Sequence, residues 1–241
     1  MKNVLVTGAS GGIGRAVAME LAQRGWAVAL HYHENRAAAQ ALEEDIRRAG
    51  GAARAYGADL ADEAQVEALF SAAERDFGFL EGLVNNAGVA WKGLFTDMSL
   101  EDWRRLLDVD LTGVFLCCRR ALPPMIREKR GSIVNVSSIW GEVGASCEAA
   151  YSAAKAGVIG LTKALAKEEG PSGIRVNCLA PGVIDTPMNG DLAAADLAAL
   201  REETPLGRIG TPEEAAQAAA FLLEQEFLTG QVLGINGGMA V

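Results

Sequence analysis

Residues 7–14 read Thr-Gly-Ala-Ser-Gly-Gly-Ile-Gly and directly follow a short apolar run that begins at Asn3. The segment 12–24 has apolar residues three or four apart, which predicts a helix. Glycines in a strand-to-helix turn let the backbone approach a pyrophosphate, and the amino terminus of the helix supplies N–H donors. The stretch therefore predicts a dinucleotide site in a first β–α unit. The alternative is a flexible loop, because a glycine cluster alone is weakly specific.

The alternation of short apolar runs and helical segments continues along the chain. Runs typical of strands buried on both faces lie at 3–7, 27–32, 52–56, 82–84, 132–137, 174–179 and 231–235. Segments with helical spacing lie at 12–24, 36–49, 62–77, 100–128, 149–169 and 212–224. The pattern predicts a single α/β domain over residues 1–241. We expect a doubly wound, parallel, seven-stranded sheet of Rossmann type with helices on both faces.

Two sequence patterns mark helix starts, and one stretch lacks regular structure. Ser99-x-x-Asp102 and Thr211-x-x-Glu214 are typical of helix amino-terminal caps. The stretch 187–210 contains only a short alanine-rich helix, predicted between Pro187 and Pro205. We expect it to form a mobile lid over the substrate.

Composition and charge exclude several classes of protein. No stretch approaches the roughly 20 apolar residues of a membrane-spanning helix. The chain begins Met1-Lys2-Asn3, and only three apolar residues then precede Thr7, too few for a secretory signal. We therefore expect a cytoplasmic protein with no membrane partner and four reduced, buried or half-buried cysteines. The net charge of −9 argues against nucleic acid as the main partner.

Tyr151 and Lys155 are the predicted acid–base group. They lie one helical turn apart, so both side chains project from one face of a helix. A nearby ammonium favours the phenolate and moves the pKa of a tyrosine from about 10 towards neutrality. Ser138 follows the fifth predicted strand, where its hydroxyl could bind a substrate carbonyl; the adjacent Ser137 is the competing assignment. The alternative for the tyrosine and lysine is an ordinary surface pair.

These signals, together with others, resemble the short-chain dehydrogenase/reductase family. They run in order from Asn3 to Gly238: Thr-Gly-x₃-Gly-Ile-Gly at 7–14, Asp59-Leu60, Asn85-Asn86-Ala87-Gly88, Ser138, Tyr151-x₃-Lys155, Pro181-Gly182, Thr229-Gly230-Gln231 and Asn236-Gly237-Gly238. Within the family the chain looks most like the bacterial 3-oxoacyl-acyl-carrier-protein reductases. The resemblance implies NADPH-dependent reduction of a 3-oxoacyl thioester to the 3-hydroxyacyl form in fatty acid synthesis. It also implies a homotetramer formed through the helix 149–169 and the last strand.

The resemblance also assigns the cofactor contacts. Asp59 and Leu60 would flank the adenine, and Ile184 and Thr186 would hold the nicotinamide carboxamide. The residues expected to bind NADP(H) are Gly8, Ser10, Gly12, Ile13, Gly14, Tyr32, His33, Arg36, Asp59, Leu60, Asn86, Ala87, Gly88, Tyr151, Lys155, Pro181, Gly182, Ile184 and Thr186. The expected catalytic residues are Ser138, which orients the ketone oxygen, Tyr151, which delivers the proton, Lys155 and Asp110.

The end of the second predicted strand favours NADP over NAD. An acid there would accept a hydrogen bond from the ribose 2′-hydroxyl, but Tyr32 occupies that position, and Arg36 could offset Glu34. Gly11 stands where many NADP-preferring relatives carry arginine. His31 and His33 share a strand face, but no third ligand lies nearby in the sequence, so we expect no metal site.

Asp110 departs from the family pattern, which has asparagine within Asn-Leu-x-Gly. If the position acts through its backbone carbonyl, an aspartate can replace the asparagine. If a side-chain amide must donate, an ionised aspartate cannot. We favour the backbone role and expect Asp110→Asn to change turnover by less than about tenfold.

Three features bear on the substrate. An acidic carrier protein would need a basic rim, for which the candidates are Arg119, Arg120, Arg127, Lys129, Arg130, Lys163 and Lys167; the alternative is solvated helix faces. The stretch 144–148, with His31-Tyr32, instead resembles reductases of the 5-aminopentanone-modified lysine of elongation factor P, in which Glu148 could pair with the substrate amine or could be a solvated acid. A third hypothesis is a catalytically silent NADP-binding scaffold.

Overall fold

The central sheet arises from the short apolar runs of the sequence. The computed structural model describes residues 2–190 and 194–240. Its strands are β1 (Asn3–Val6), β2 (Ala27–Tyr32), β3 (Ala52–Gly57), β4 (Gly82–Asn85), β5 (Gly131–Val136), β6 (Ile174–Pro181) and β7 (Val232–Ile235). All neighbours pair in parallel in the order β3-β2-β1-β4-β5-β6-β7. The predicted doubly wound seven-stranded sheet is confirmed.

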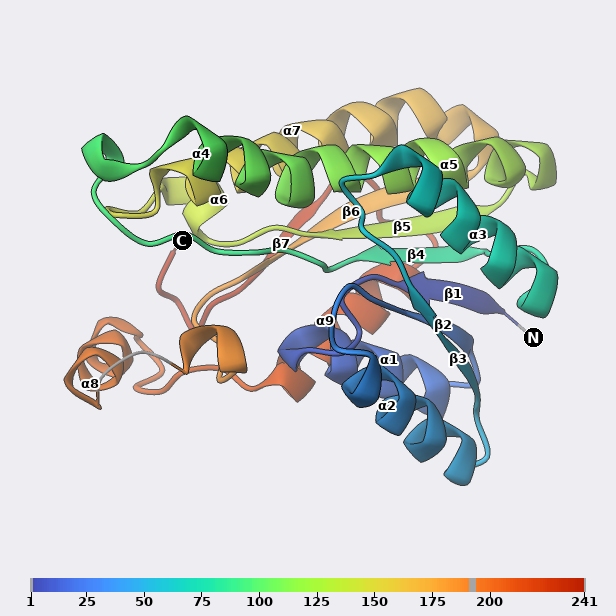
Figure 1. Ribbon diagram of the computed structural model, residues 1–241, viewed down its shortest axis with the longest axis horizontal. Helices are drawn as coiled ribbons and strands as arrows, with labels where there is room; N and C mark the ends of the chain where they lie inside the picture. The colour runs from blue at the N-terminus through green and yellow to red at the C-terminus, as the bar shows by residue number, and fades with distance from the viewer. Residues whose placement is uncertain (1, 191–193, 241) are drawn as a thin grey trace.

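Helices cover both faces of this sheet (Figure 1). One face carries α1 (Gly12–Gln23), α2 (Arg36–Arg48) and α9 (Pro212–Glu224), and the other carries α3 (Glu63–Phe77), α4 (Leu100–Leu107), α5 (Gly113–Glu128) and α7 (Ala149–Glu169). The shorter elements are η1 (Phe95–Asp97), η2 (Asp108–Thr112), α6 (Trp140–Val143), η3 (Gly170–Ser172), η4 (Pro187–Asn189) and α8 (Ala194–Glu203). Each helical layer packs an apolar stripe on the sheet, giving one buried core on each side.

The order of the strands determines where a ligand can bind. The chain adds β2 and β3 on one side of β1 and then returns to place β4 on the other side. The loops after β1 and β4 therefore diverge in opposite directions at the carboxyl edge of the sheet. Open α/β sheets bind ligands in the crevice at such a switch point.

The predicted helix 100–128 is interrupted. It consists of α4, a π-helical turn η2 and α5. A π turn contains more residues than an α turn and is common at functional sites. Apolar spacing alone does not reveal it, because one wider turn hardly changes the pattern. The turn contains Asp110, whose side chain is fully buried.

The predicted helix caps are confirmed. Thr211 and Glu214 form a complete capping box at the start of α9, and the Ser99 side chain accepts a hydrogen bond from the Asp102 N–H at the start of α4. The predicted short helix within 187–210 is α8, preceded by η4. The part of the expected lid at residues 191–193 lies outside the described residues.

The cysteines follow the sequence prediction in three cases out of four. Cys117, Cys118 and Cys178 are buried free thiols, whereas Cys147 is exposed and does not pack in the core as expected. It lies in the loop before α7, where its backbone has a φ of 63°. Over residues 2–190 and 194–240, no helix combines the length and the apolar character that crossing a bilayer requires.

Candidate active site

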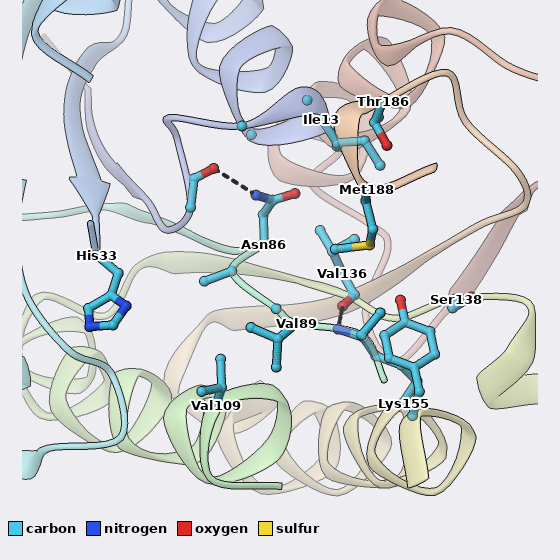
Figure 2. Close-up of a pocket in the computed structure, with 18 of the residues that line it drawn as sticks. Ile13, His33, Asn86, Val89, Val109, Val136, Ser138, Lys155, Thr186 and Met188 are labelled. Atoms are coloured by element: carbon cyan, nitrogen blue, oxygen red, sulfur yellow. Dashed lines mark hydrogen bonds between the residues drawn. The ribbon is translucent and has the colours of Figure 1, made fainter. Parts of the chain in front are cut away.

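A cavity of about 1180 Å³ opens at the carboxyl edge of the sheet. It runs from the loop after β2 to the start of α7. Figure 2 shows His33 near one end and Ser138 and Lys155 near the other, with Val89 and Val109 between them. All the predicted cofactor residues line this cavity except Tyr32 and Arg36. The catalytic candidates Ser138, Tyr151 and Lys155 also line it, while Asp110 lies behind Lys155.

The glycine-rich turn after β1 is held by hydrogen bonds from the two residues that follow β4. Thr7 Oγ1 accepts from the N–H groups of Asn86 and Ala87 at 2.9 and 3.0 Å, and Asn86 Nδ2 donates to the Thr7 carbonyl at 3.0 Å. The packing leaves no room for side chains. A Cβ at Gly14 would lie 2.3 Å from the Gly8 carbonyl oxygen, and one at Gly12 would lie 2.6 Å from Thr186 Cγ2.

The start of α1 fits the pyrophosphate of a dinucleotide. The first N–H groups of a helix lack partners within the helix, and Gly11, at the N-cap, supplies no side-chain cap. These donors and the partial positive charge of the helix end therefore face the cavity. A Cβ at Gly11 meets nothing within 4 Å, so the approach to them is open. We infer that this turn can hold the phosphates of a nicotinamide dinucleotide.

His31 supports the turn from below. Its Nδ1 accepts the Gly8 N–H at 3.1 Å, and its Nε2 lies 3.0 Å from the Ala58 carbonyl, so Nε2 carries the proton. Burial lowers the pKa of His31 to about 4, which keeps the ring neutral. Both ring nitrogens are thus used for structure. Across the described part of the chain, no three His, Cys, Asp or Glu residues are grouped as metal ligands would be.

The end of the cavity near β2 differs from the sequence expectation. Tyr32 turns away from the cavity and lies over β3, where a Cβ at Gly57 would be 3.0 Å from its hydroxyl. Arg36 is the first residue of α2 and does not line the cavity. His33 and Glu34 do line it. Alternation along β2 explains the position of Tyr32, because neighbouring residues of a strand face opposite sides and His31 lines the cavity.

The two serines after β5 have different roles. Ser137 Oγ donates to the Lys155 carbonyl at 2.8 Å and fixes the backbone of α7. Ser138 Oγ accepts the Trp140 N–H at 3.2 Å and is close enough to Tyr151 to lower the pKa of the phenol by hydrogen bonding. Ser138 is therefore the serine next to the tyrosine hydroxyl.

Lys155 and Asp110 form a buried ion pair. Lys155 Nζ lies 3.1 Å from Asp110 Oδ2. It also donates to the Val136 carbonyl at 3.3 Å, as the dashed line in Figure 2 shows. Asp110 Oδ1 accepts the Val89 N–H at 2.7 Å. A Cβ at Gly88 would come within 2.7 Å of Asp110 Oδ2, so this glycine leaves the space that the pair occupies. The sequence did not reveal the pair, because its two residues come from different helices.

The pKa of Tyr151 moves in the opposite direction from the sequence prediction. Burial raises it above 10, and the carboxylates of Asp110 and Glu148 raise it further. The Lys155 ammonium and the Ser138 hydrogen bond lower it, but by less. The prediction considered only the lysine and was wrong because it ignored burial and the lysine's own counter-ion. In this structure Tyr151 is a protonated phenol at neutral pH.

The basic residues predicted to form a rim do not line the cavity, and three of them, Arg119, Arg120 and Arg130, pair with carboxylates. Arg119 pairs with Glu63, and Arg120 pairs with Glu67 and Glu74, both at 2.7 Å. Besides Lys155, the lysines and arginines that line the cavity are Lys92, Arg104 and Arg105, which were not predicted from the sequence. Two adjacent arginines on the helix that the Ser99 cap predicts could have indicated this basic lining from the sequence. The half-buried Glu148 also lines the cavity, and burial raises the pKa of its carboxyl.

Comparison with known proteins agrees with this geometry. The family model described as enoyl-(acyl carrier protein) reductase matches residues 8–240. The chain belongs to the short-chain dehydrogenase/reductase family. As a member of this family it is an oxidoreductase, and the family implies a nicotinamide cofactor.

Several relatives in this family match over almost the whole chain. The 3-oxoacyl-[acyl-carrier-protein] reductase FabG of Staphylococcus aureus is 41% identical, covering 99% of this chain and 98% of the relative. The 3-oxoacyl-[acyl-carrier-protein] reductase of Synechocystis is 42% identical, covering 98% and 96%. The uncharacterized oxidoreductase YmfI of Bacillus subtilis is 42% identical, covering 98% of each. A crystal structure of a putative gluconate dehydrogenase from Agrobacterium tumefaciens superposes with a TM-score of 0.95 at 32% identity, covering 99% and 95%.

Proposed function

We propose that this protein reduces a 3-oxoacyl thioester on acyl carrier protein to the 3-hydroxyacyl form with NADPH. The observation that carries the proposal is the placement of Ser138, Tyr151 and Lys155 in the cavity that also contains the uncapped start of α1. The full-length similarity to named 3-oxoacyl-acyl-carrier-protein reductases supports the substrate class.

The side chains at this end of the cavity suit a proton transfer to a ketone oxygen. Bound NADPH would supply the hydride to the carbonyl carbon. Ser138 Oγ would donate a hydrogen bond to the carbonyl oxygen and stabilise the developing alkoxide. Tyr151 would then give its hydroxyl proton to that oxygen. Lys155, held by Asp110 and the Val136 carbonyl, would bind the ribose next to the nicotinamide.

NADP remains the proposed form of the cofactor. No acid stands at the last residue of β2, where one would accept from a free ribose 2′-hydroxyl. Because Tyr32 and Arg36 do not line the cavity, His33 is the predicted residue that remains there to meet a 2′-phosphate. The ratio of kcat/KM for NADPH and NADH measures this preference, and a ratio near one would contradict it.

The carrier protein, the lid and the oligomer are parts of the same proposal. Lys92, Arg104 and Arg105 give the cavity cationic lining that an acidic carrier protein or its phosphate group could contact. The described parts of the expected lid, residues 187–190 and 194–210, would close over the substrate. The exposed small residues of α7, Ala153, Ala156 and Gly160, would pack on a twin helix in a cytoplasmic homotetramer. A monomer in sizing chromatography would contradict the oligomer.

The decisive experiment follows NADPH absorbance with acetoacetyl-acyl-carrier-protein as substrate. Wild-type turnover that falls at least about 10³-fold in Tyr151→Phe, with NADPH binding retained, is the expected result. The phenylalanine keeps the ring and removes only the proton donor. Equal turnover in both proteins would overturn the assignment of Tyr151.

Glu148 favours a second candidate, the reductase of the 5-aminopentanone-modified lysine of elongation factor P. Its carboxyl lines the cavity and lies close enough to Tyr151 to influence the phenol. An acid there could pair with the amine of such a ketone. No turnover of the thioester, together with turnover of the modified protein that Glu148→Gln weakens, would support this candidate. Loss of both activities with NADPH still bound would support the silent scaffold.

A further inference from the structure

The ion pair between Asp110 and Lys155 connects to the proton donor. Lys155 Nζ lies 5.4 Å from the centre of the Tyr151 ring. The same nitrogen is 3.1 Å from Asp110 Oδ2. The charge that could draw the proton from the phenol is therefore already balanced by a carboxylate.

Burial strengthens the interaction between the charges of Asp110 and Lys155. Asp110 is 0% exposed and Lys155 is 3% exposed, so little water screens either charge. Interactions between charges are much stronger at such sites than at the surface. Both oxygens of Asp110 are in use, because Oδ1 accepts the Val89 N–H and Oδ2 lies beside Lys155 in the space that the missing side chain of Gly88 leaves.

The groups that face Tyr151 act in both directions. Lys155 on the same helix and Ser138 after β5 favour the phenolate. Asp110 in η2 and Glu148 before α7 favour the phenol. Burial adds to the second set, so the proton stays on the ring.

The groups that face Lys155 explain why it remains charged. Burial alone would lower the pKa of its ammonium, but Asp110 and Tyr151 raise it more, with a smaller contribution from Cys178. Without the carboxylate, Lys155 would be a buried cation without a counter-ion. Asp110 therefore affects both members of the acid–base group.

We propose that the Asp110 carboxylate is a positioning residue that neutralises Lys155 and so keeps Tyr151 in its proton-donating form, which extends ketone reduction to higher pH. The inference rests on the proposed reductase function. Reduction uses the phenol, whereas the reverse reaction needs the phenolate as base. The role of Asp110 belongs to its side chain and is separate from any role of its backbone carbonyl.

The first test compares pH profiles of wild type and Asp110→Asn. The amide keeps the shape of the side chain and removes the charge. The alkaline limb of kcat/KM for thioester reduction is expected to move down by about one pH unit or more, while turnover at pH 7 changes by less than about tenfold. Asp97→Asn is the matched control, because Asp97 is an exposed carboxylate before α4 that does not line the cavity. Identical limbs in wild type and Asp110→Asn would overturn the proposal.

The second test needs neither cofactor nor substrate. Ultraviolet titration of tyrosinate reports the three tyrosines of the chain, and subtracting the Tyr151→Phe protein isolates Tyr151. Its ionisation is expected at lower pH in Asp110→Asn than in wild type. Ionisation of Tyr151 at the same pH in Asp110→Asn and in wild type would overturn the proposal. If the wild type fails to reduce any thioester, this titration still decides the role of Asp110 separately from the proposed function.

A double variant tests the same proposal if Asp110→Asn fails to fold. Lys155→Gln/Asp110→Asn removes both charges and leaves no buried ion alone. Because the native pair is neutral as a unit, the Tyr151 step in the double variant is expected to stay within about half a pH unit of wild type. A shift of more than about one unit would show that the carboxylate acts on Tyr151 by some route other than balancing Lys155.

Discussion

The two ends of the cavity are built in different ways. The end at the glycine-rich turn uses backbone groups: Gly8, Gly12 and Gly14 pack where no side chain fits, and the neutral His31 holds the turn. The end at Tyr151 uses buried charges, with Asp110 and Lys155 3.1 Å apart. The first end depends on shape and the second on the balance of charge. Mutations should therefore separate them, with shape changes affecting binding and stability and charge changes affecting the pH dependence of the reaction.

The largest expected effect comes from a substitution in the glycine-rich turn, the end of the cavity that depends on shape. Gly14→Ala places a Cβ 2.3 Å from the Gly8 carbonyl oxygen and 2.4 Å from Asn86 Nδ2, so the turn must move. We expect NADPH affinity to fall about 100-fold and the free energy of unfolding to fall by about 3 kcal/mol. Fluorescence titration with NADPH and chemical denaturation measure the two effects.

A neighbouring glycine provides the control. A Cβ at Gly11 meets nothing within 4 Å, and the residue has an extended backbone with a φ of −121°. Gly11→Ala should change the free energy of unfolding by less than about 0.5 kcal/mol. Equal losses of stability in the two variants would show that close packing does not define this end.

Lowering the pH should destabilise the protein through His31, the residue that holds the glycine-rich turn. A histidine with a pKa of about 4 in the fold and about 6.5 when unfolded takes up a proton more readily in the unfolded state. Stability is therefore complete above pH 6.5 and declines as the pH falls towards 4, by about 3 kcal/mol in total. Denaturation at several pH values measures the slope, which His31→Gln should flatten. An unchanged slope in that variant would assign the acid sensitivity to other groups.

Gly88→Ala should disturb the charged end. Its Cβ would lie 2.7 Å from Asp110 Oδ2 and 3.2 Å from Lys155 Nζ, so the pair must shift. We expect a loss of stability of about 1–2 kcal/mol and about a tenfold loss of turnover. Gly170→Ala, where a Cβ meets nothing within 4 Å, is the control. Unchanged kinetics in Gly88→Ala would mean that the pair tolerates displacement.

The smallest expected effect comes from destabilising α9, a helix that belongs to neither end of the cavity. Thr211→Ala removes the side chain that caps α9 and should cost about 1 kcal/mol of stability. Because neither Thr211 nor any residue of α9 lines the cavity, neither NADPH affinity nor the pH profile should change. A change in NADPH affinity or in the pH profile would mean that both properties depend on the overall stability of the fold.

Much of the fold was predictable because its signals are local. The strands, the Thr211 cap and the glycine-rich turn each depend on residues close together in the sequence. The pairing of Arg120 with Glu74 and of Asp110 with Lys155 was not predictable, because it depends on how separate helices pack. The direction of the Tyr151 pKa depends on that packing and on burial, so spacing alone gave the wrong sign.

The hydrogen bonds from Asn86 and Ala87 to Thr7 have a consequence for the order of folding. They join residues 79 and 80 positions apart, and closing so long a loop carries an entropic cost that must be met before the contact forms. A nascent chain that ends before β4 contains the whole glycine-rich segment but lacks the groups that hold it in shape. The ability to bind a nucleotide therefore arises only after β4 has been synthesised and has paired with β1.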